Sequence, residues 1–169
     1  MRVYSQQNSR FYTASVTAKT YNDKDTGIAF DFDQMARFKA VGTALHEAGV
    51  CRLWPALLTA TAVGWRRGEV IGLHWRDVDL ERRKLYVRQN HTVENGVHSF
   101  GKTKSKTSQR DISMPLSFHS ALEAHREAAE IDSIIRGVKL TGDTAVFATQ
   151  RGTFPHPDNL HRALQNLVD

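Results

Sequence analysis

The apolar residues of this 169-residue chain change their spacing along the sequence, and that change limits the folds that the chain can adopt. From Asp31 they recur every three or four residues, as on one face of a helix. In KLYVRQ, residues 84–89, apolar and polar side chains alternate, as in a strand with one buried face. Helical spacing then returns from about Phe118. The order of these patterns predicts an α+β fold that is mostly helical, with a small three-stranded antiparallel sheet.

Capping and breaking residues indicate where the helices begin and end. Asp31 and Gln34 have the spacing of a capping box, and Gly49 is placed to end the helix that they begin. A second, mostly apolar helix is expected from near Leu53 to Gly64. The remaining expected helices are residues 67–73, residues 118–135 with Ser117 as the N-cap, and a last helix from about Asp158.

Asn95 and Gly96 form the strongest turn signal, because an Asn-Gly pair favours the tight turn of a hairpin. The segment that follows, GKTKSKTSQRDISMP at residues 101–115, leads from a basic strand edge to a half-buried strand. Together with KLYVRQ, these features predict three short antiparallel strands. A later segment, TAVFATQRGT at residues 144–153, fits a short apolar strand or a loop.

The basic residues of the chain are concentrated in one segment. The whole chain has a formal net charge of +5, and residues 81–110 contain eight Lys and Arg residues but only two acidic ones. This segment therefore accounts for the whole excess of positive charge. A concentration of this kind suits a polyanionic partner.

Other sequence features exclude several classes of protein. Cys51 is the only cysteine, so no disulfide framework is expected, and the histidines lack the spacing of a zinc site. We expect no metal and no cofactor. The chain has no apolar run of the ~20 residues that a membrane span needs, and no glycine-rich phosphate loop. We therefore expect a cytoplasmic protein without a membrane partner or a small-molecule substrate.

Two adjacent arginines lie between two glycines, at the junction of two expected helices. Arg66 and Arg67 follow Gly64, and Glu69 is the one neighbouring acid. A guanidinium at the start of a helix can bind an anion, and a carboxylate can hold that guanidinium in place. The alternative is an exposed pair of arginines that contributes surface charge only.

Three lysines occupy alternate positions after the expected hairpin, and in a strand they would point to the same side. They are Lys102, Lys104 and Lys106, and Arg110 follows them. Such an arrangement fits either a solvated hairpin tip or contact with a nucleic-acid backbone. A lysine can also give up a proton, which suits a general acid beside a leaving oxygen.

Three segments together resemble the catalytic domain of the tyrosine recombinase, or phage integrase, family. They are TAVGWRRGEVIGLHWRDVDLERRKLYV, GKTKSKTSQRDISMP and AVFATQRGTFPHPDNLHRAL, in the family's order and spacing. The first is the most specific, because the family pattern of Gly, an apolar residue, Arg, any residue, Gly or Ser, and Glu matches residues 64–69. The resemblance covers the chain from about Asp31 onward and implies a site-specific recombinase that acts on duplex DNA.

The resemblance also implies roles for individual residues. Arg66 takes the position of the arginine that contacts the scissile phosphate, with Glu69 as its supporting acid. Lys104 takes the position of the catalytic lysine, and Lys106 is the alternate. In the family a tyrosine attacks the phosphate and forms a phosphotyrosine intermediate, while two arginines stabilise the transition state. The expected additional DNA contacts are Arg67, Arg88, Lys102, Lys106 and Arg110.

The chain also departs from the family pattern. The family continues with a His-x-x-Arg motif and a nucleophilic tyrosine, but no His here has Arg three positions later. The four tyrosines, Tyr4, Tyr12, Tyr21 and Tyr86, all precede the lysines. We expect residues 31–169 to be a partial catalytic domain, truncated and inactive. Residues 1–30 are expected to be a linker or the remnant of an upstream DNA-binding domain.

Two other interpretations remain open from the sequence. The chain can be a non-catalytic DNA-binding or regulatory module that uses the basic hairpin, either to occupy a DNA site or to pair with other recombinase protomers. It can also be a decayed gene product whose exposed core makes it prone to aggregate.

Overall fold

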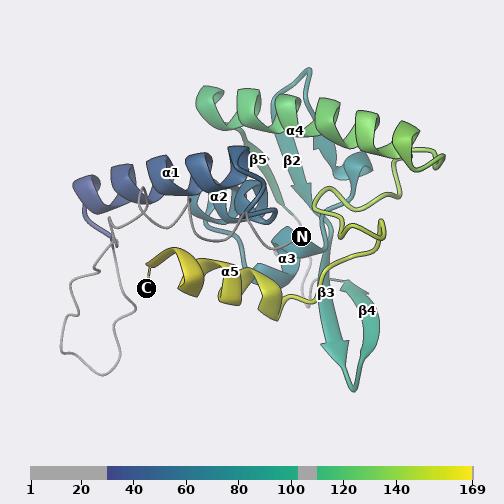
Figure 1. The fold of residues 1–169 in the computed structure, drawn as a ribbon. Coiled ribbons are helices and arrows are strands. Elements are labelled where there is room, and N and C mark those ends of the chain that lie inside the picture. The colour runs from purple at the N-terminus through teal and green to yellow at the C-terminus, as the bar shows by residue number, and fades with distance from the viewer. Residues whose placement is uncertain (1–29, 103–109, 169) are drawn as a thin grey trace, which may run out of the picture. The chain divides into compact units, whose positions relative to one another are not determined.

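A computed structural model describes residues 30–102 and 110–168 of the chain. The chain divides into two compact units, Met1–Trp54 with Arg162–Asp169, and Pro55–His161. The elements are labelled in Figure 1, and the mixture of helices and small antiparallel sheets confirms the predicted α+β class. Almost all of the segment predicted to be a linker, residues 1–30, lies outside the described residues.

The first unit contains helix α1, Phe32–Glu47, whose predicted ends are confirmed. The Asp31 side chain accepts a hydrogen bond from the Gln34 amide at 2.8 Å, and the Gln34 side chain accepts one from the Asp31 amide at 3.0 Å. Gly49 follows the helix with φ of +73°, a conformation that favours glycine. Phe38 is fully buried and packs edge to face on Trp54, with 5.2 Å between ring centroids.

The second unit is built around short helices and a three-stranded sheet. Helix α2, Trp54–Val63, is followed by α3, Arg67–Ile71, and by the 3-10 turn η2, Trp75–Asp77. Strands β1, Val78–Asp79, β2, Lys84–Val87, and β5, Arg110–Ser113, form an antiparallel sheet in the order β1-β2-β5. Leu85 and Val87 of β2 are buried, as their alternation predicts.

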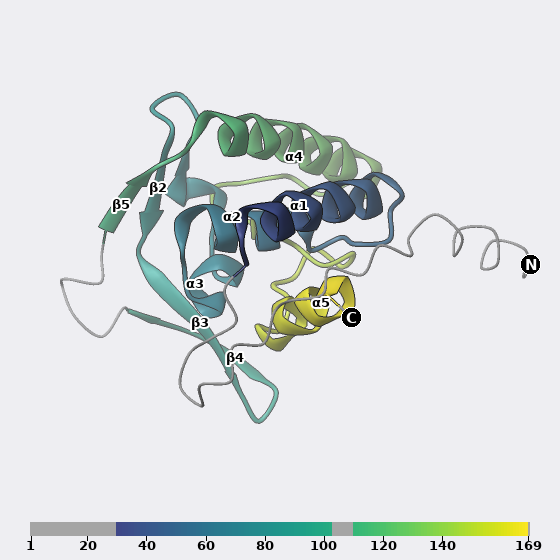
Figure 2. The same ribbon diagram turned by 90° about the vertical axis from the view of Figure 1, so that its left-hand side faces the viewer.

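A separate hairpin consists of β3, Gln89–Glu94, and β4, Val97–Lys102. Asn95 and Gly96 connect the strands with φ of +51° and +76°, which confirms the predicted tight turn. The hairpin extends away from the three-stranded sheet (Figures 1 and 2). The sequence predicts three strands in all, whereas the described residues contain five. Strand β1 is too short for its pattern to be recognised. The two strands of the hairpin form a sheet of their own, separate from the three-stranded sheet.

The remaining helices begin close to their predicted positions. Helix α4 spans Leu116–Ile135 with Pro115 as its N-cap, so the prediction of Ser117 as the cap is wrong and Ser117 lies in the first turn. Proline fits this boundary because its fixed φ suits a helix start and it has no amide hydrogen to leave unpaired. The segment 144–153 is a loop with one β-bridge, between His74 and Ala145. Helix α5 spans Asp158–Val168.

The core of the second unit is formed mainly by apolar side chains. Its buried side chains include Leu57, Trp65, Val70, Ile71, Leu73, Trp75, Leu85, Val87, Met114, Phe118, Leu122, Val146 and Phe147. The three tryptophans, Trp54, Trp65 and Trp75, are all buried. In the part of the chain that the structure describes, no helix has both the length and the apolar character needed to cross a membrane.

Candidate functional site

The turn between α2 and α3 determines where Arg66 lies. Gly64 ends α2 with φ of +64°, and its amide donates to the Ala60 carbonyl at 2.9 Å. Arg66 is then the extended N-cap residue of α3, and its side chain is 78% exposed. The glycine conformation thus turns the chain so that Arg66 stands in solvent, while its neighbour Trp65 is buried.

Glu69 is the buried acid of this site. It is 3% exposed, and its carboxylate accepts a hydrogen bond from the Arg66 amide at 3.1 Å. One oxygen also lies 3.5 Å from Nη1 of Arg66. Burial raises the pKa of the Glu69 carboxyl, but hydrogen bonds from Arg110 and the Arg66 amide, with both guanidinium charges, lower it by more. Glu69 therefore stays ionised and holds the start of α3.

Arg110 is a second cation on the same carboxylate. Its Nη2 donates to Oε2 of Glu69 at 2.9 Å, and its Nη1 donates to Oε1 at 3.3 Å. The guanidinium also lies over the Trp65 ring, 5.9 Å from its centroid. The sequence assigns Arg110 to DNA contact, whereas the structure brings it to Glu69, and the two residues are 41 positions apart.

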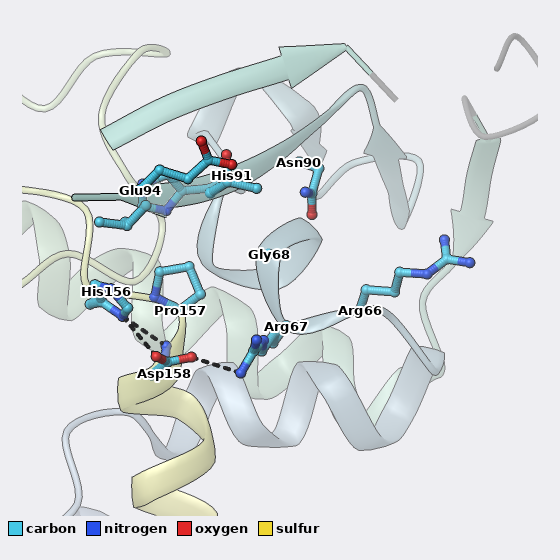
Figure 3. Close-up of a pocket in the computed structure, with 11 residues that line it drawn as sticks. Arg66, Arg67, Gly68, Asn90, His91, Glu94, His156, Pro157 and Asp158 are labelled. Atoms are coloured by element: carbon cyan, nitrogen blue, oxygen red, sulfur yellow. Dashed lines mark hydrogen bonds and ion pairs between the residues drawn. The ribbon is translucent and has the colours of Figure 1, made fainter. Parts of the chain in front are cut away.

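A pocket of about 620 Å³ lies beside the two adjacent arginines (Figure 3). Figure 3 shows Arg67 directed toward Asp158 and Arg66 directed away from it. Arg67 donates to Asp158 at 2.7 Å, and the Asp158 amide donates to Nδ1 of His156 at 3.1 Å. The pocket is lined by Arg66, Arg67, Gly68, Asn90, His91, Thr92, Val93, Glu94, His156, Pro157 and Asp158.

Gly68 lets α3 approach the hairpin closely at this pocket. A Cβ atom at Gly68 would lie 2.6 Å from the backbone oxygen of His91 and would also meet the Asn90 side chain. Such distances are shorter than real Cβ contacts, so only glycine fits without movement of β3. The position of Arg66 relative to β3 thus depends on a residue that carries no functional group.

His91 lies at the centre of an aromatic stack on the hairpin. It is 1% exposed, its ring stacks on Phe100 with 4.7 Å between centroids, and its Nε2 lies 3.0 Å from Nδ1 of His98. Burial and the nearby His98, His156 and His74 lower the pKa of His91 to about 4. Within the described residues, Nδ1 of His91 is buried without a hydrogen-bond partner. His91 is therefore neutral near pH 7.

The other basic residues predicted to contact DNA have different surroundings. Arg88 is 61% exposed, and its Nε lies 3.0 Å from Oδ1 of the buried Asp77. The backbone of Lys102 pairs with Gln89 at the end of the hairpin. Lys104 and Lys106 lie outside the described residues. The structure therefore brings Arg66, Glu69 and Arg110 together, and it does not describe the position of either candidate catalytic lysine.

Sequence reasoning missed Asp158 as part of the site. Its only local signal is its position at the start of α5, where acidic side chains are common. Its partner Arg67 is 91 positions earlier, so no local pattern could reveal the pair. Residues 30–102 and 110–168 contain no group of three or more His, Cys, Asp or Glu side chains that could hold a metal ion.

Comparison with known proteins finds similarity to recombinases in sequence and in structure. A tyrosine recombinase XerC-like protein of Caldanaerobacter subterraneus subsp. tengcongensis is 27% identical over 130 residues, which are 70% of this chain and 33% of that protein. No protein-family model matches the chain. The chain thus spans about a third of the length of this curated relative.

Solved structures share the fold at low sequence identity. The Tn1549 transposon integrase in complex with circular intermediate DNA has a TM-score of 0.63 and 17% identity, over 84% of this chain and 47% of the integrase chain. The same integrase with transposon right end DNA has a TM-score of 0.62 and 16% identity, over 86% and 47%. XerA recombinase has a TM-score of 0.59 and 16% identity, over 88% and 44%. In sequence, this chain is thus similar to a tyrosine recombinase, and it shares the fold of the Tn1549 integrase and XerA recombinase structures.

Proposed function

We propose that the chain binds duplex DNA through one half of a tyrosine recombinase phosphate site, in which Arg66 is the phosphate ligand. Glu69 supports Arg66, and Lys104 is the cation that would protonate a leaving oxygen. The Tn1549 integrase structures contain DNA, and this shared fold supports DNA as the partner of this chain. The proposed catalytic region is residues 31–169, with residues 1–30 as a lead-in.

The observation that carries the proposal is the balance of charge at Glu69. Two guanidinium groups, from Arg66 and Arg110, share one buried carboxylate. This trio has a net charge of +1, and its most exposed member is Arg66. A positive charge that is held by a buried partner and open to solvent suits an anionic ligand such as a DNA phosphate.

The same proposal includes binding without cleavage by these 169 residues. Phosphoryl transfer of this kind forms a bond from a tyrosine oxygen to phosphorus, breaks the bond to the 5′ oxygen and transfers a proton to that oxygen. Tyr86 is the one tyrosine among the described residues, and it lies in β2 with the Arg88 guanidinium over its ring at 5.3 Å. Its backbone pairs with that of Asp111 in β5.

Further contacts to the DNA backbone are proposed for four other basic residues: Arg67, Arg88, Lys102 and Lys106. Arg67 and Arg88 are each paired with an acid, so each must exchange that partner for a phosphate, and we expect their contributions to be smaller. A cytoplasmic location and pairing with other recombinase protomers belong to the same proposal.

Two measurements on the purified chain test this function. Fluorescence anisotropy with a labelled duplex should show binding whose logarithmic affinity falls linearly with the logarithm of salt concentration. Incubation with a nicked suicide duplex, followed by denaturing electrophoresis, should show no covalent protein–DNA product. The absence of duplex binding at low salt would contradict the DNA-binding role, and a covalent product would contradict binding without cleavage.

A further inference from the structure

We propose that Arg110 is a positioning residue for Arg66, which acts through the shared carboxylate of Glu69 and does not itself bind DNA. The proposal rests on the proposed function, because it concerns how the phosphate ligand Arg66 is held. It changes the role that the sequence predicts for Arg110, which is direct contact with DNA.

The hydrogen bonds of Glu69 support this role. Arg110 is bidentate, with one nitrogen on each carboxylate oxygen at 2.9 and 3.3 Å. The Arg66 guanidinium makes one longer contact, at 3.5 Å. A bidentate pair fixes the orientation of a carboxylate better than a single contact does. Arg110 therefore orients the Glu69 carboxylate, and this carboxylate in turn accepts a hydrogen bond from the Arg66 amide at 3.1 Å.

Arg110 also contacts the chain on the other side of Arg66. Its guanidinium lies over the ring of Trp65, which immediately precedes Arg66, while Glu69 follows Arg66 by three residues. One side chain from β5 thus holds both the residue before Arg66 and the acid that caps its amide. Because Trp65 and Glu69 are both buried, Arg110 connects two buried side chains and thereby fixes the turn on which Arg66 stands.

The exposure of the two arginines separates their roles. The Arg66 side chain is 78% exposed, whereas the Arg110 side chain is 33% exposed and has its two terminal nitrogens on Glu69. Transferring Arg110 to a DNA phosphate would leave the buried Glu69 without its main partner, which is strongly unfavourable. Arg66 can bind a phosphate while its amide remains on Glu69.

Duplex affinity of four variants tests the proposal: Arg66→Ala, Arg110→Lys, the double variant of these two, and Glu69→Gln. Arg110→Lys keeps the positive charge but loses the bidentate geometry, so we expect affinity to fall about fivefold. In the Arg66→Ala background the same change should alter affinity by less than about twofold, because the residue through which it acts is absent. Glu69→Gln removes a negative charge next to DNA, yet we expect it to lower affinity because Arg110 loses its partner.

A matched control separates this effect from general loss of stability. Arg126 in α4 also lies over a buried tryptophan ring, 4.7 Å from the Trp75 centroid, and pairs with Glu130 at 2.7 Å. Its side chain is 32% exposed, almost the same as that of Arg110. Arg126→Lys should leave duplex affinity unchanged, and thermal unfolding of each variant shows that the folded chain is being measured.

The outcomes distinguish the two proposals. Equal losses from Arg110→Lys with and without Arg66, or a gain in affinity from Glu69→Gln, would overturn the positioning role while leaving Arg66 as the phosphate ligand. No loss from Arg66→Ala would overturn the proposed function itself, and the positioning role with it. If Arg110→Lys does not fold, the sign of the Glu69→Gln effect decides the question.

Discussion

Arg67 and Asp158 form an ion pair of 2.7 Å that connects the first residue of α3 to the first residue of α5. Their side chains are 61% and 45% exposed, so the pair lies at the surface. Arg66, the adjacent residue, contacts the Glu69 carboxylate at a longer distance of 3.5 Å, and its side chain is 78% exposed. Two neighbouring arginines with the same chemistry thus have different freedom to bind an anion.

Removal of the Asp158 charge should release Arg67 for DNA. We expect Asp158→Asn to raise duplex affinity by about threefold at low salt, because an exposed ion pair is weak and the freed guanidinium can reach a phosphate. The increase should disappear in the Arg67→Ala background. Asp132→Asn is the control, since Asp132 of α4 also forms a 2.7 Å pair with an arginine, the C-cap residue Arg136. An equal increase for both variants would mean that only the overall charge matters.

Gly68 should be required for the packing of α3 on the hairpin. A Cβ atom there would lie 2.6 Å from the His91 backbone oxygen, so we expect Gly68→Ala to lower the free energy of unfolding by about 1–3 kcal/mol. Gly101→Ala in β4 is the control, because nothing lies within 4 Å of its Cβ position. Urea unfolding measures both, and equal stabilities would contradict the close approach described here.

His91 should make stability depend on pH in the acidic range. Its pKa is lowered from 6.5 to about 4 in the folded chain, so the unfolded chain binds a proton between these values and the folded chain does not. The free energy of unfolding should therefore fall as the pH is lowered from about 6.5 to about 4, by at most about 3 kcal/mol from this residue. His91→Phe should flatten that part of the profile in urea unfolding. An unchanged slope would show that His91 titrates normally.

The charge of Arg88 should stabilise the buried carboxylate of Asp77. Asp77 is 2% exposed and its pKa is raised, because burial outweighs the attraction of Arg88 and Arg76. We expect Arg88→Ala to destabilise the chain by about 1–3 kcal/mol, since the buried carboxylate loses a cation. Asp77→Asn in the same chain should recover most of this loss.

A neighbouring pair gives the control for Asp77. Arg82 is 78% exposed and lies 3.6 Å from the less buried Asp79, so Arg82→Ala should change stability by less than about 0.5 kcal/mol. Similar losses of stability from Arg82→Ala and Arg88→Ala would show that burial of the paired acid does not determine how much each arginine stabilises the fold.

Local patterns explain which parts of the fold could be predicted from the sequence. The capping box at Asp31 and the Asn95-Gly96 turn involve neighbours in the chain, and both are confirmed. Strand β1 has only two residues, too few for an alternation to be visible. Ser117 has a residue type that favours caps, but α4 begins earlier, with Pro115 as its N-cap.

The candidate site shows the same division between local and distant contacts. Arg66 and Glu69 are three residues apart, and the contact between them follows from their spacing at a helix start. The pairs Arg110 with Glu69 and Arg67 with Asp158 join residues 41 and 91 positions apart, so they depend on the tertiary fold. The sequence predicts DNA contacts for Arg88 and Arg110, whereas the fold gives each of them a buried acid as a specific partner, Asp77 and Glu69.

The duplex affinity of Arg66→Ala compared with that of Arg67→Ala tests the central claim most directly. Fluorescence anisotropy at one low salt concentration should show a loss of about tenfold or more for Arg66→Ala, because a charge-assisted contact to a phosphate is lost. Arg67→Ala, whose charge is already paired with Asp158, should lose no more than about threefold. Equal losses for the two variants, or a larger loss for Arg67→Ala, would contradict the assignment of Arg66 as the phosphate ligand.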